Sequence, residues 1–262
     1  MALRLVVLER IYGPYRPEDF TPAFLSLCQG LEVDVKVIGT TGRGWLVVEL
    51  RGEDEEVARR LLEGEMGLAP VRPEEVGKGS VIRGRIISVK EDGLLVDIGV
   101  FEPYNLDALV PLDALRCQLA NGLDLDMEVL SSLFCLVENL PLEVKLLEEP
   151  LSVEGEPVRT ELSEGQVREI EEWVRLGLDR LIITGVSYHA VKKAVGGSGL
   201  FRHVVRMERL GILENCLVLK LGTSIGQFLR VLGRRLKNAE ICVFRPRKIL
   251  KAVPGRYTRL AF

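Results

Sequence analysis

Histidine, paired cysteines and long apolar runs are what this sequence has least of. Its 262 residues include two histidines, and they do not form a His-x-x-x-His pair of the kind that holds zinc on a helix. The five cysteines are far apart and form no Cys-x-x-Cys pair, so neither a zinc site nor a disulfide framework is indicated. We therefore expect no metal, no cofactor and no catalytic residue.

Membrane and export features are also missing from the sequence. No apolar run reaches the roughly 18 residues that a membrane span needs. The first residues are too few, and too soon acidic at Glu9, for a secretory signal peptide. Asparagine and glutamine are scarce beside abundant glutamate, arginine and lysine, a balance common in thermophile proteins. We expect a globular protein of the cytoplasm.

The net charge of −3 hides a split along the chain. Residues 185–262 contain sixteen Lys or Arg and only three acidic residues, which gives this segment a net charge of +13. The rest of the chain has nineteen basic and thirty-five acidic residues, a net charge of −16. Such asymmetry between segments indicates a basic face that binds a polyanion.

Residues 1–76 alternate the periodicities of strands and helices. Val33 to Val37 alternates apolar and polar residues, which is the period of a half-buried strand, while Phe20, Phe24 and Cys28 recur at helical spacing. The expected order is strand, helix, two strands, helix and a short strand at 69–72. This order predicts an α+β domain of the ferredoxin-like βαββα(β) type.

Residues 77–150 predict a small barrel. Two strands between Gly79 and Gly99 are joined by a turn at Asp92-Gly93. The further elements are a strand at Ala108 to Pro111, a helical insert from Leu112 to about Cys135, and a closing strand at Leu142 to Leu146. The segment resembles an S1-type OB barrel. Such barrels usually offer aromatic side chains to bases, but the matching strand here reads Leu94-Leu95-Val96. This weakens the case for nucleic-acid binding by the barrel, and a spacer or a protein-binding surface stays open.

Residues 151–262 predict a second ferredoxin-like unit, of order βαββαβ, with a helix in front. That first helix begins at Ser163, because Ser163-Glu164-Gly165-Gln166 has the spacing of a capping box. The later elements are strands near 181–184, 204–210, 216–221 and 241–244, with helices at 187–194 and 225–236 between them.

One stretch of this last segment is distinctive. Residues 202–214 read Arg-His-Val-Val-Arg-Met-Glu-Arg-Leu-Gly-Ile-Leu-Glu, and Leu221-Gly222-Thr223 and Val243-Phe244-Arg245-Pro246 follow. With the order of segments, they resemble an archaeal family known only as a domain of unknown function. The resemblance spans nearly the whole chain, and it implies no activity and no site.

The helix expected from Ile225 to Leu236 has apolar residues on one stripe and Arg230, Arg234 and Lys237 on the opposite one. No acidic residue lies within it, and like charges this close repel by a few tenths of a kcal/mol per pair. A polyanion-binding face is therefore favoured over a merely solvated face, or over pairing with the acidic front half of the chain.

Three further segments extend the predicted basic face. A glycine-rich loop at 196–199 lies among basic residues, where it could approach a nucleic-acid backbone or simply end the preceding helix. Free N–H groups at 222–224 precede a helix and could receive a phosphate, although an ordinary N-cap by Thr223 or Ser224, which needs no ligand, is favoured there. The tail after Phe244 is basic, with Tyr257 and Phe262 as candidates for stacking, unless it is simply solvated. The predicted nucleic-acid-binding residues are Lys192, Lys193, Arg202, His203, Arg206, Arg230, Arg234, Arg235, Lys237, Arg245, Arg247, Lys248, Lys251 and, in the barrel, Arg83 and Arg85; the predicted phosphate-binding residues are Gly222, Thr223 and Ser224.

We therefore expect a non-enzymatic adaptor that binds nucleic acid, with RNA the first choice and ribosomal RNA one candidate. Two alternatives stay open. The chain could be a scaffold whose acidic front and basic back meet different proteins. It could also be an enzyme on a phosphorylated substrate, for which His189 or His203 would need a carboxylate beside it in a pocket.

Overall fold

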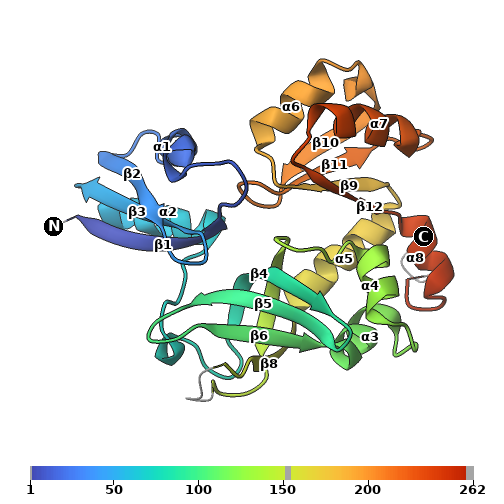
Figure 1. Ribbon diagram of the computed structural model, residues 1–262, viewed down its shortest axis with the longest axis horizontal. Coiled ribbons are helices and arrows are strands. Elements are labelled where there is room, and N and C mark those ends of the chain that lie inside the picture. The colour runs from blue at the N-terminus through green and yellow to red at the C-terminus, as the bar shows by residue number, and fades with distance from the viewer. Residues whose placement is uncertain (1, 151–154, 258–262) are drawn as a thin grey trace.

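Two open sheets and one closed barrel make up the computed structural model, which describes residues 2–150 and 155–257 (Figure 1). The open sheets come from the two ends of the chain, and the barrel lies between them in sequence. The predicted α+β class and the predicted central barrel are confirmed. Within the described residues, no helix is long and apolar enough to cross a membrane.

The N-terminal module is a three-stranded antiparallel sheet in the order β1-β3-β2 with two helices. Val35 and Val37 are buried while their neighbours in β2 are exposed, so the alternation in sequence places one face on the core. The short strand expected at 69–72 is reduced to isolated bridges at Leu68 and Val71. The elements are β1 (Leu3–Arg10), α1 (Thr21–Leu27), β2 (Val33–Thr40), β3 (Trp45–Gly52) and α2 (Glu55–Met66), with short 3-10 helices at Pro17–Phe20 and Pro73–Glu75.

The barrel module closes in the order β4-β5-β6-β8-β7, and β4 pairs with β7. All its strand pairs are antiparallel except β6 with β8. Strand β8 lies beyond residue 150, so the barrel extends past the domain boundary that the sequence predicted. Two helices occupy the predicted insert. The elements are β4 (Val81–Lys90), β5 (Gly93–Val100), β6 (Leu106–Pro111), α3 (Leu112–Ala120), α4 (Met127–Phe134), β7 (Pro141–Leu146) and β8 (Val158–Leu162).

The C-terminal module is a four-stranded antiparallel sheet in the order β10-β11-β9-β12. Helices α6 and α7 cover one face, where their apolar side chains meet those of the strands. The other face packs against the barrel module and two further helices, α5 and α8. The elements are α5 (Glu164–Leu176), β9 (Arg180–Thr184), α6 (Tyr188–Gly196), the 3-10 helix η3 (Leu200–His203), β10 (Val204–Arg209), β11 (Asn215–Leu219), α7 (Ile225–Arg235), β12 (Glu240–Phe244) and α8 (Pro246–Ala252).

Helix α8 replaces the front of the basic tail that the sequence predicted. Pro246 stands at its first turn, where a proline needs no N–H donor. Ile249 and Val253 are fully buried against the large core that the barrel shares with the C-terminal sheet. Residues 246–252 form a helix because these apolar residues recur at helical spacing. The sequence analysis missed this pattern because basic residues lie between them.

Arg85 of β4 holds the three modules together. Its side chain is fully buried, and its guanidinium donates hydrogen bonds to the carboxylates of Glu9 on β1 and Glu214 between β10 and β11. Tyr12 donates to the other oxygen of Glu214 at 2.6 Å and accepts from the Gly185 N–H at 2.9 Å. One cation thus joins a strand of the N-terminal module, the barrel and the C-terminal module.

The electrostatics of this junction follow from its burial. Burial raises the pKa of Glu214. Burial alone would lower the pKa of Arg85, but the carboxylates of Glu214 and Glu9 outweigh it, so that pKa is raised. Gly211 leaves the room that the pair needs, because a Cβ there would lie 2.6 Å from an Arg85 guanidinium nitrogen.

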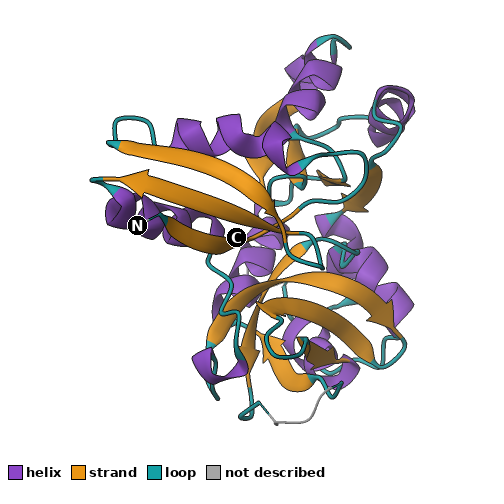
Figure 2. Cartoon of the chain, turned by 60° about the vertical axis from the view of Figure 1, so that its left-hand side comes forward, coloured by secondary structure: helices purple, strands orange, loops and turns teal. Residues whose placement is uncertain are grey.

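The turn between β10 and β11 also inserts an apolar side chain into the N-terminal module. Leu213 is fully buried among the apolar residues of that module's core, such as Val7 and Phe24. Two hydrogen bonds hold the turn in place. The Ile212 N–H donates to the Glu9 side-chain carboxylate at 2.8 Å, and the Leu213 carbonyl accepts from the Val186 N–H at 3.2 Å. Figure 2 shows the N-terminal sheet above the barrel as a separate body of strands.

A second contact fixes the N-terminal module on the barrel. The indole N–H of Trp45, which is fully buried, donates to the Asp97 carboxylate at 3.1 Å. Arg43 forms ion pairs with Asp97 and with Asp107 of β6. Burial raises the pKa of Asp97. The relative placement of the modules therefore rests on buried polar contacts as well as on apolar packing.

Candidate nucleic-acid interface

Helix α7 carries the cations that the sequence placed on its outer stripe. Ile225, Phe228 and Leu232 are buried against the sheet, and Arg230, Arg234 and Lys237 are exposed on or just beyond the helix. Among the described residues, none of these three cations forms an ion pair with a carboxylate. The intramolecular pairing that the sequence left open therefore does not occur within the described part of the chain.

Helix α6 lies beside α7 on the same face of the sheet and adds to its positive charge (Figure 1). Ser187 caps its N-terminus, because the Ser187 hydroxyl accepts from the Ala190 N–H at 3.4 Å. Lys192 and Lys193 are exposed, and neither α6 nor α7 contains an acidic residue. Since charges here are of one sign, this layer has the potential that attracts a polyanion.

Arg235, which was predicted to bind nucleic acid with these cations, instead connects α7 to the end of α6. Its guanidinium donates to the carbonyls of Ala194 at 3.0 Å and Gly197 at 2.7 Å. These carbonyls belong to the end of α6, so Arg235 supplies partners that the end of a helix otherwise lacks. We assign Arg235 a positioning role for the glycine-rich loop at 196–199 rather than a phosphate contact.

Replacing Arg235 with Ala is expected to lower the free energy of unfolding by about 1–2 kcal/mol, because two carbonyls of the α6 terminus lose their donors. Arg234→Ala is the matched control, since its exposed side chain has no hydrogen-bond or ion-pair partner in the described part of the chain, and its stability should stay within about 0.5 kcal/mol of the native protein. Urea denaturation measures both. Equal effects of the two substitutions would contradict this role of Arg235.

The end of the sheet remote from the junction brings two predicted segments together. The Lys220 N–H donates to the His203 carbonyl at 2.9 Å, so η3 lies beside the loop at 220–224. Arg202 and Lys220 are exposed, and His203 is half-buried. Gly222 has a φ of +78°, which the chain needs to turn toward α7. Thr223 is half-buried, and Ser224 precedes α7 without a side-chain cap hydrogen bond.

Two exposed apolar residues at this same end were missed by the sequence analysis. Phe201 is 63% exposed and Leu221 is 71% exposed. Lys220 was missed as well, because it lies alone in a strand-like stretch. The sequence did contain a sign of Phe201: it is an aromatic residue between a glycine-rich loop and a basic residue, and aromatic residues beside basic ones are common in nucleic-acid interfaces.

Two further basic positions are engaged inside the C-terminal module. Arg206 forms an ion pair with Glu208, which also binds Arg180 at 2.8 Å. Arg180 is fully buried with its guanidinium 4.6 Å from the centre of the Trp173 ring. Arg206 keeps an exposed side chain, but it is held by the Glu208 carboxylate, which it shares with Arg180.

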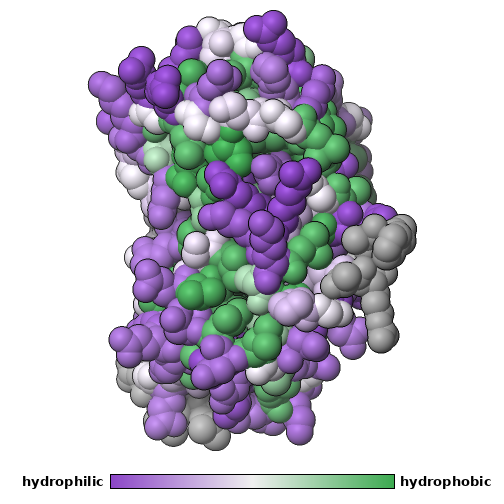
Figure 3. All heavy atoms as spheres, turned by 90° about the vertical axis from the view of Figure 1, so that its right-hand side faces the viewer, coloured by the Kyte–Doolittle hydropathy of each residue, from purple (hydrophilic) through white to green (hydrophobic). Residues whose placement is uncertain are grey.

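The basic residues of α8 lie on the other face of the sheet from α6 and α7. Arg247, Lys248 and Lys251 are exposed there, while Arg245 is half-buried at the start of α8. Figure 3 faces the side of the molecule where α8 lies, and hydrophilic and hydrophobic side chains are mixed on it. The predicted basic residues therefore lie on two separate surfaces, one on α6 and α7 and the other on α8.

The aromatic residues of the tail do not support stacking. Tyr257 is fully buried, and its hydroxyl donates to the Leu119 carbonyl at 2.8 Å, so the prediction that it meets bases is wrong. Phe262 lies outside the described residues.

In the barrel, the prediction for Arg85 is also wrong. Its side chain is fully buried and its charge is taken by Glu9 and Glu214, so a phosphate cannot reach it. Arg83 is half-buried and donates to the carbonyls of Leu210 and Glu65. It lies at the junction of the modules, away from α6 and α7.

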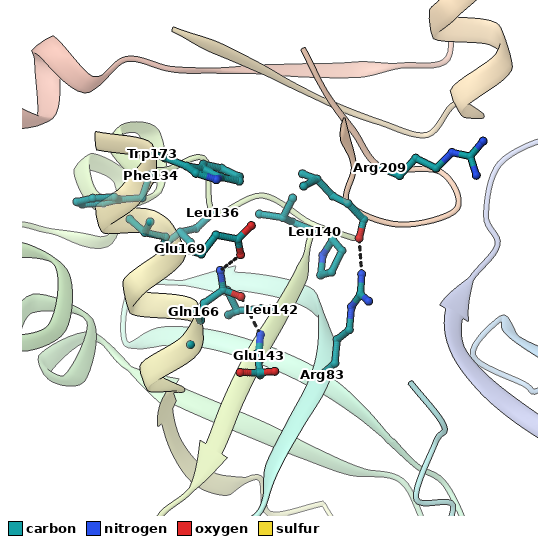
Figure 4. Close-up of a pocket in the computed structure, with 14 residues that line it drawn as sticks. Arg83, Phe134, Leu136, Leu140, Leu142, Glu143, Gln166, Glu169, Trp173 and Arg209 are labelled. Carbon is teal, nitrogen blue, oxygen red and sulfur yellow. Dashed lines mark hydrogen bonds between the residues drawn. The ribbon is translucent and has the colours of Figure 1, made fainter. Parts of the chain in front are cut away.

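A cleft of about 410 Å³ lies between α5 and the turn after β10 (Figure 4). Gln166 and Trp173 lie along α5, and Arg83 lies across from them. The polar groups of the α5 wall are already paired, because Gln166 accepts from the Glu143 N–H at 3.0 Å and donates to Glu169 at 3.2 Å. The amide of Gln166 on the α5 wall is therefore already engaged within the protein and is not available to a ligand.

A second cavity of about 300 Å³ joins His189 to carboxylates, as the enzyme alternative requires. Glu9 lines it, but that carboxylate already binds Arg85 and the Ile212 N–H. Glu65 is exposed beside it, and Arg209 lies over the Tyr188 ring at 4.4 Å. Glu65 is thus the carboxylate of this cavity on which an acid–base role for His189 would depend.

Two family models match the sequence of this chain. The model of the DUF2110 central domain matches residues 76–174, which hold the barrel and most of α5. The model of the DUF2110 C-terminal domain matches residues 178–244, which hold the four-stranded sheet with α6 and α7. No curated protein matches the sequence. The matches name no activity and no source organism, so an archaeal source stays a prediction. The chain belongs to the DUF2110 family, whose central and C-terminal domains it carries in that order.

Proposed function

We propose that this protein is a non-enzymatic adaptor of the cytoplasm that binds RNA through the exposed cations of the α6–α7 surface. That surface consists of Lys192, Lys193, Arg202, Lys220, Arg230, Arg234 and Lys237. The observation that carries the proposal is the absence, within the described residues, of any ion pair to Arg230, Arg234 or Lys237, in a helix layer without acidic residues. Ribosomal RNA is one candidate partner.

The physical reason is the cost of like charges. Arg230 and Arg234 are four residues apart, so they lie one above the other about 6 Å apart along α7. Their repulsion is not relieved within the described part of the chain. A nucleic-acid backbone would relieve it, and the release of its condensed counterions would drive binding.

We also propose finer fold assignments for the three modules. The barrel order, the parallel β6–β8 pair and the helices between β6 and β7 support an OB-type barrel. The C-terminal sheet, in which two βαβ-like halves interleave as β10-β11-β9-β12, supports a ferredoxin-like unit. The N-terminal order β1-β3-β2 supports a related unit without a full fourth strand. Likeness of the barrel to S1 domains in particular remains a proposal.

The test compares two triple variants with equal loss of charge. Arg230→Ala, Arg234→Ala and Lys237→Ala together remove three phosphate contacts from the α6–α7 surface. We expect affinity for a single-stranded oligoribonucleotide to fall by at least tenfold, and the slope of log K against log salt to become shallower by about 2, at roughly 0.7 per contact. Filter binding at a series of salt concentrations measures both quantities.

The matched control removes Arg247, Lys248 and Lys251 from α8, on the opposite face of the sheet. It changes the net charge equally, so a general charge effect would weaken binding in both variants, whereas a localised interface would leave the control near the native affinity. Equal losses, or a salt-independent affinity, would contradict the proposal. Binding of a protein instead of RNA would favour the scaffold alternative, and turnover of a phosphorylated compound lost in His189→Ala would favour the enzyme.

A further inference from the structure

Phe201 is an apolar side chain that folding leaves in water. Its neighbour Leu200 is buried in the core between the sheet and the α6–α7 layer, while the Phe201 ring is 63% exposed. A ring in this position gains little from the protein's own core. A single exposed apolar residue is ordinary at a protein surface, but Leu221, 71% exposed, lies at the same end of the sheet, so what this ring can bind is decided by the groups around it.

The surroundings of the ring are cationic. Arg202 follows it in the same 3-10 helix, and the bond from the Lys220 N–H to the His203 carbonyl places Lys220 at the same end of the sheet. Both cations are exposed, and neither η3 nor the loop at 220–224 contains an acidic residue. The ring therefore stands among positive charges that have no carboxylate partner within the described residues.

The geometry points to a single-stranded nucleic acid as the ligand of the α6–α7 surface, with one base stacked on Phe201. This inference rests on the proposed function and specifies its substrate. An aromatic ring binds the face of a base, and cations beside it bind the phosphates on either side. A duplex keeps its base faces covered by neighbouring bases, whereas a single strand or a loop can present them.

The same arrangement provides a path for the rest of the bound nucleic acid. The loop at 220–224 leads directly into α7, so Arg202 and Lys220, at the N-terminal end of the helix, are followed along it by the basic residues from Arg230 to Lys237. A strand whose base lies on Phe201 can continue its backbone over that stripe. Positive charge from Arg202 to Lys237 then forms one path rather than separate contacts.

The test uses Phe201→Leu, which keeps an apolar side chain but removes the aromatic face. We expect its affinity for a twelve-nucleotide single-stranded oligoribonucleotide to fall by about tenfold, with an unchanged salt slope because no phosphate contact is lost. Affinity for an RNA duplex of the same length should stay within twofold of the native value. Phe201→Trp should restore single-strand binding, and the thermal midpoint should not move because the position is exposed.

The control is Leu221→Ala, which trims an exposed apolar residue at the same end without touching an aromatic face. It should leave single-strand affinity within twofold. If Phe201→Leu weakens single-strand and duplex binding equally, or weakens neither, the stacking inference fails while the charge-based function stands. If the native protein binds neither RNA at low salt, the proposed function fails first. Loss of a protein partner with Phe201→Leu, without loss of RNA affinity, would also overturn the inference.

Discussion

Replacing Arg85 with Met is expected to lower the free energy of unfolding by about 3–5 kcal/mol. The substitution removes the cation between Glu9 and Glu214 and leaves both carboxylates buried without a counter-charge. Met replaces the apolar stem of Arg but not its guanidinium, so the loss combines two uncompensated charges with a small cavity, and only the part due to charge depends on pH. Because Arg85 links three modules, the whole chain should unfold at a lower urea concentration.

The loss of unfolding free energy in Arg85→Met should depend on pH. Burial already raises the pKa of Glu214 in the native protein, and loss of the cation should raise it further above the unfolded value of about 4.3. A carboxyl with a raised folded pKa binds its proton more tightly in the folded state, so stability increases on acidification and is lost as pH rises through the folded pKa. Urea denaturation should therefore show a smaller deficit near pH 5 than near pH 8.

Arg83→Met is the matched control on the same strand. Arg83 is half-buried and donates only to backbone carbonyls, so its loss should cost about 1 kcal/mol with little dependence on pH. A second check is to add Glu9→Gln and Glu214→Gln to Arg85→Met, which removes the uncompensated charges and should recover part of the loss. An equal loss of unfolding free energy in Arg85→Met and Arg83→Met would contradict the role assigned to the ion pairs of Arg85 with Glu9 and Glu214.

The pair Arg83 and Arg85 also shows where sequence reasoning stops. Two residues apart on a strand, they have the same local pattern and were both predicted to bind nucleic acid. What separates them is a pair of carboxylates 76 and 129 residues away in sequence. Local periodicity describes which face of a strand a residue is on, but it does not describe which distant acid will lie opposite that residue.

The elements themselves were more accessible. The alternation of Val33 to Val37 and the stripe of Ile225, Phe228 and Leu232 are local patterns, and the strand and helix that they predicted are confirmed. Strand β8 was missed because Val158–Leu162 is short and because its parallel partner β6 lies far away in sequence, where Ala108 pairs with Val158. Its membership of the barrel depends on closure, which is a property of the whole sheet.

The placement of the exposed cations was predictable only in part. The charge of residues 185–262 drew attention to α7, whose cations Arg230 and Arg234 are exposed. Charge counting could not divide the cations of α7 from those of α8, because the two helices lie on opposite faces of one sheet. It also could not show that Arg235 connects α7 to the end of α6, since the carbonyls that it binds belong to a different helix.

Replacing Leu213 with Ala is expected to lower the free energy of unfolding by about 2–5 kcal/mol. Leu213 is fully buried, and it belongs to the C-terminal module while its neighbours belong to the core of the N-terminal module. The substitution leaves a cavity between two modules, and the surrounding groups can close it only by moving the modules together. Leu221→Ala, at a position 71% exposed in the same module, should change stability by less than about 0.5 kcal/mol.

The two tryptophans make the location of the Leu213→Ala effect measurable. Trp45 is buried in the N-terminal module and Trp173 lies on α5 beside the C-terminal sheet. Fluorescence of single-tryptophan variants, with Phe at the other position, follows each module during urea denaturation. Because Trp45→Phe itself removes the hydrogen bond to Asp97, each shift caused by Leu213→Ala is measured against the same single-tryptophan protein with Leu213 intact. Because the turn at Leu213 couples the modules, its truncation should lower the urea midpoint reported by Trp45 more than the midpoint reported by Trp173. Equal shifts at both tryptophans would mean that the turn stabilises the chain as a whole rather than the docking of the N-terminal module.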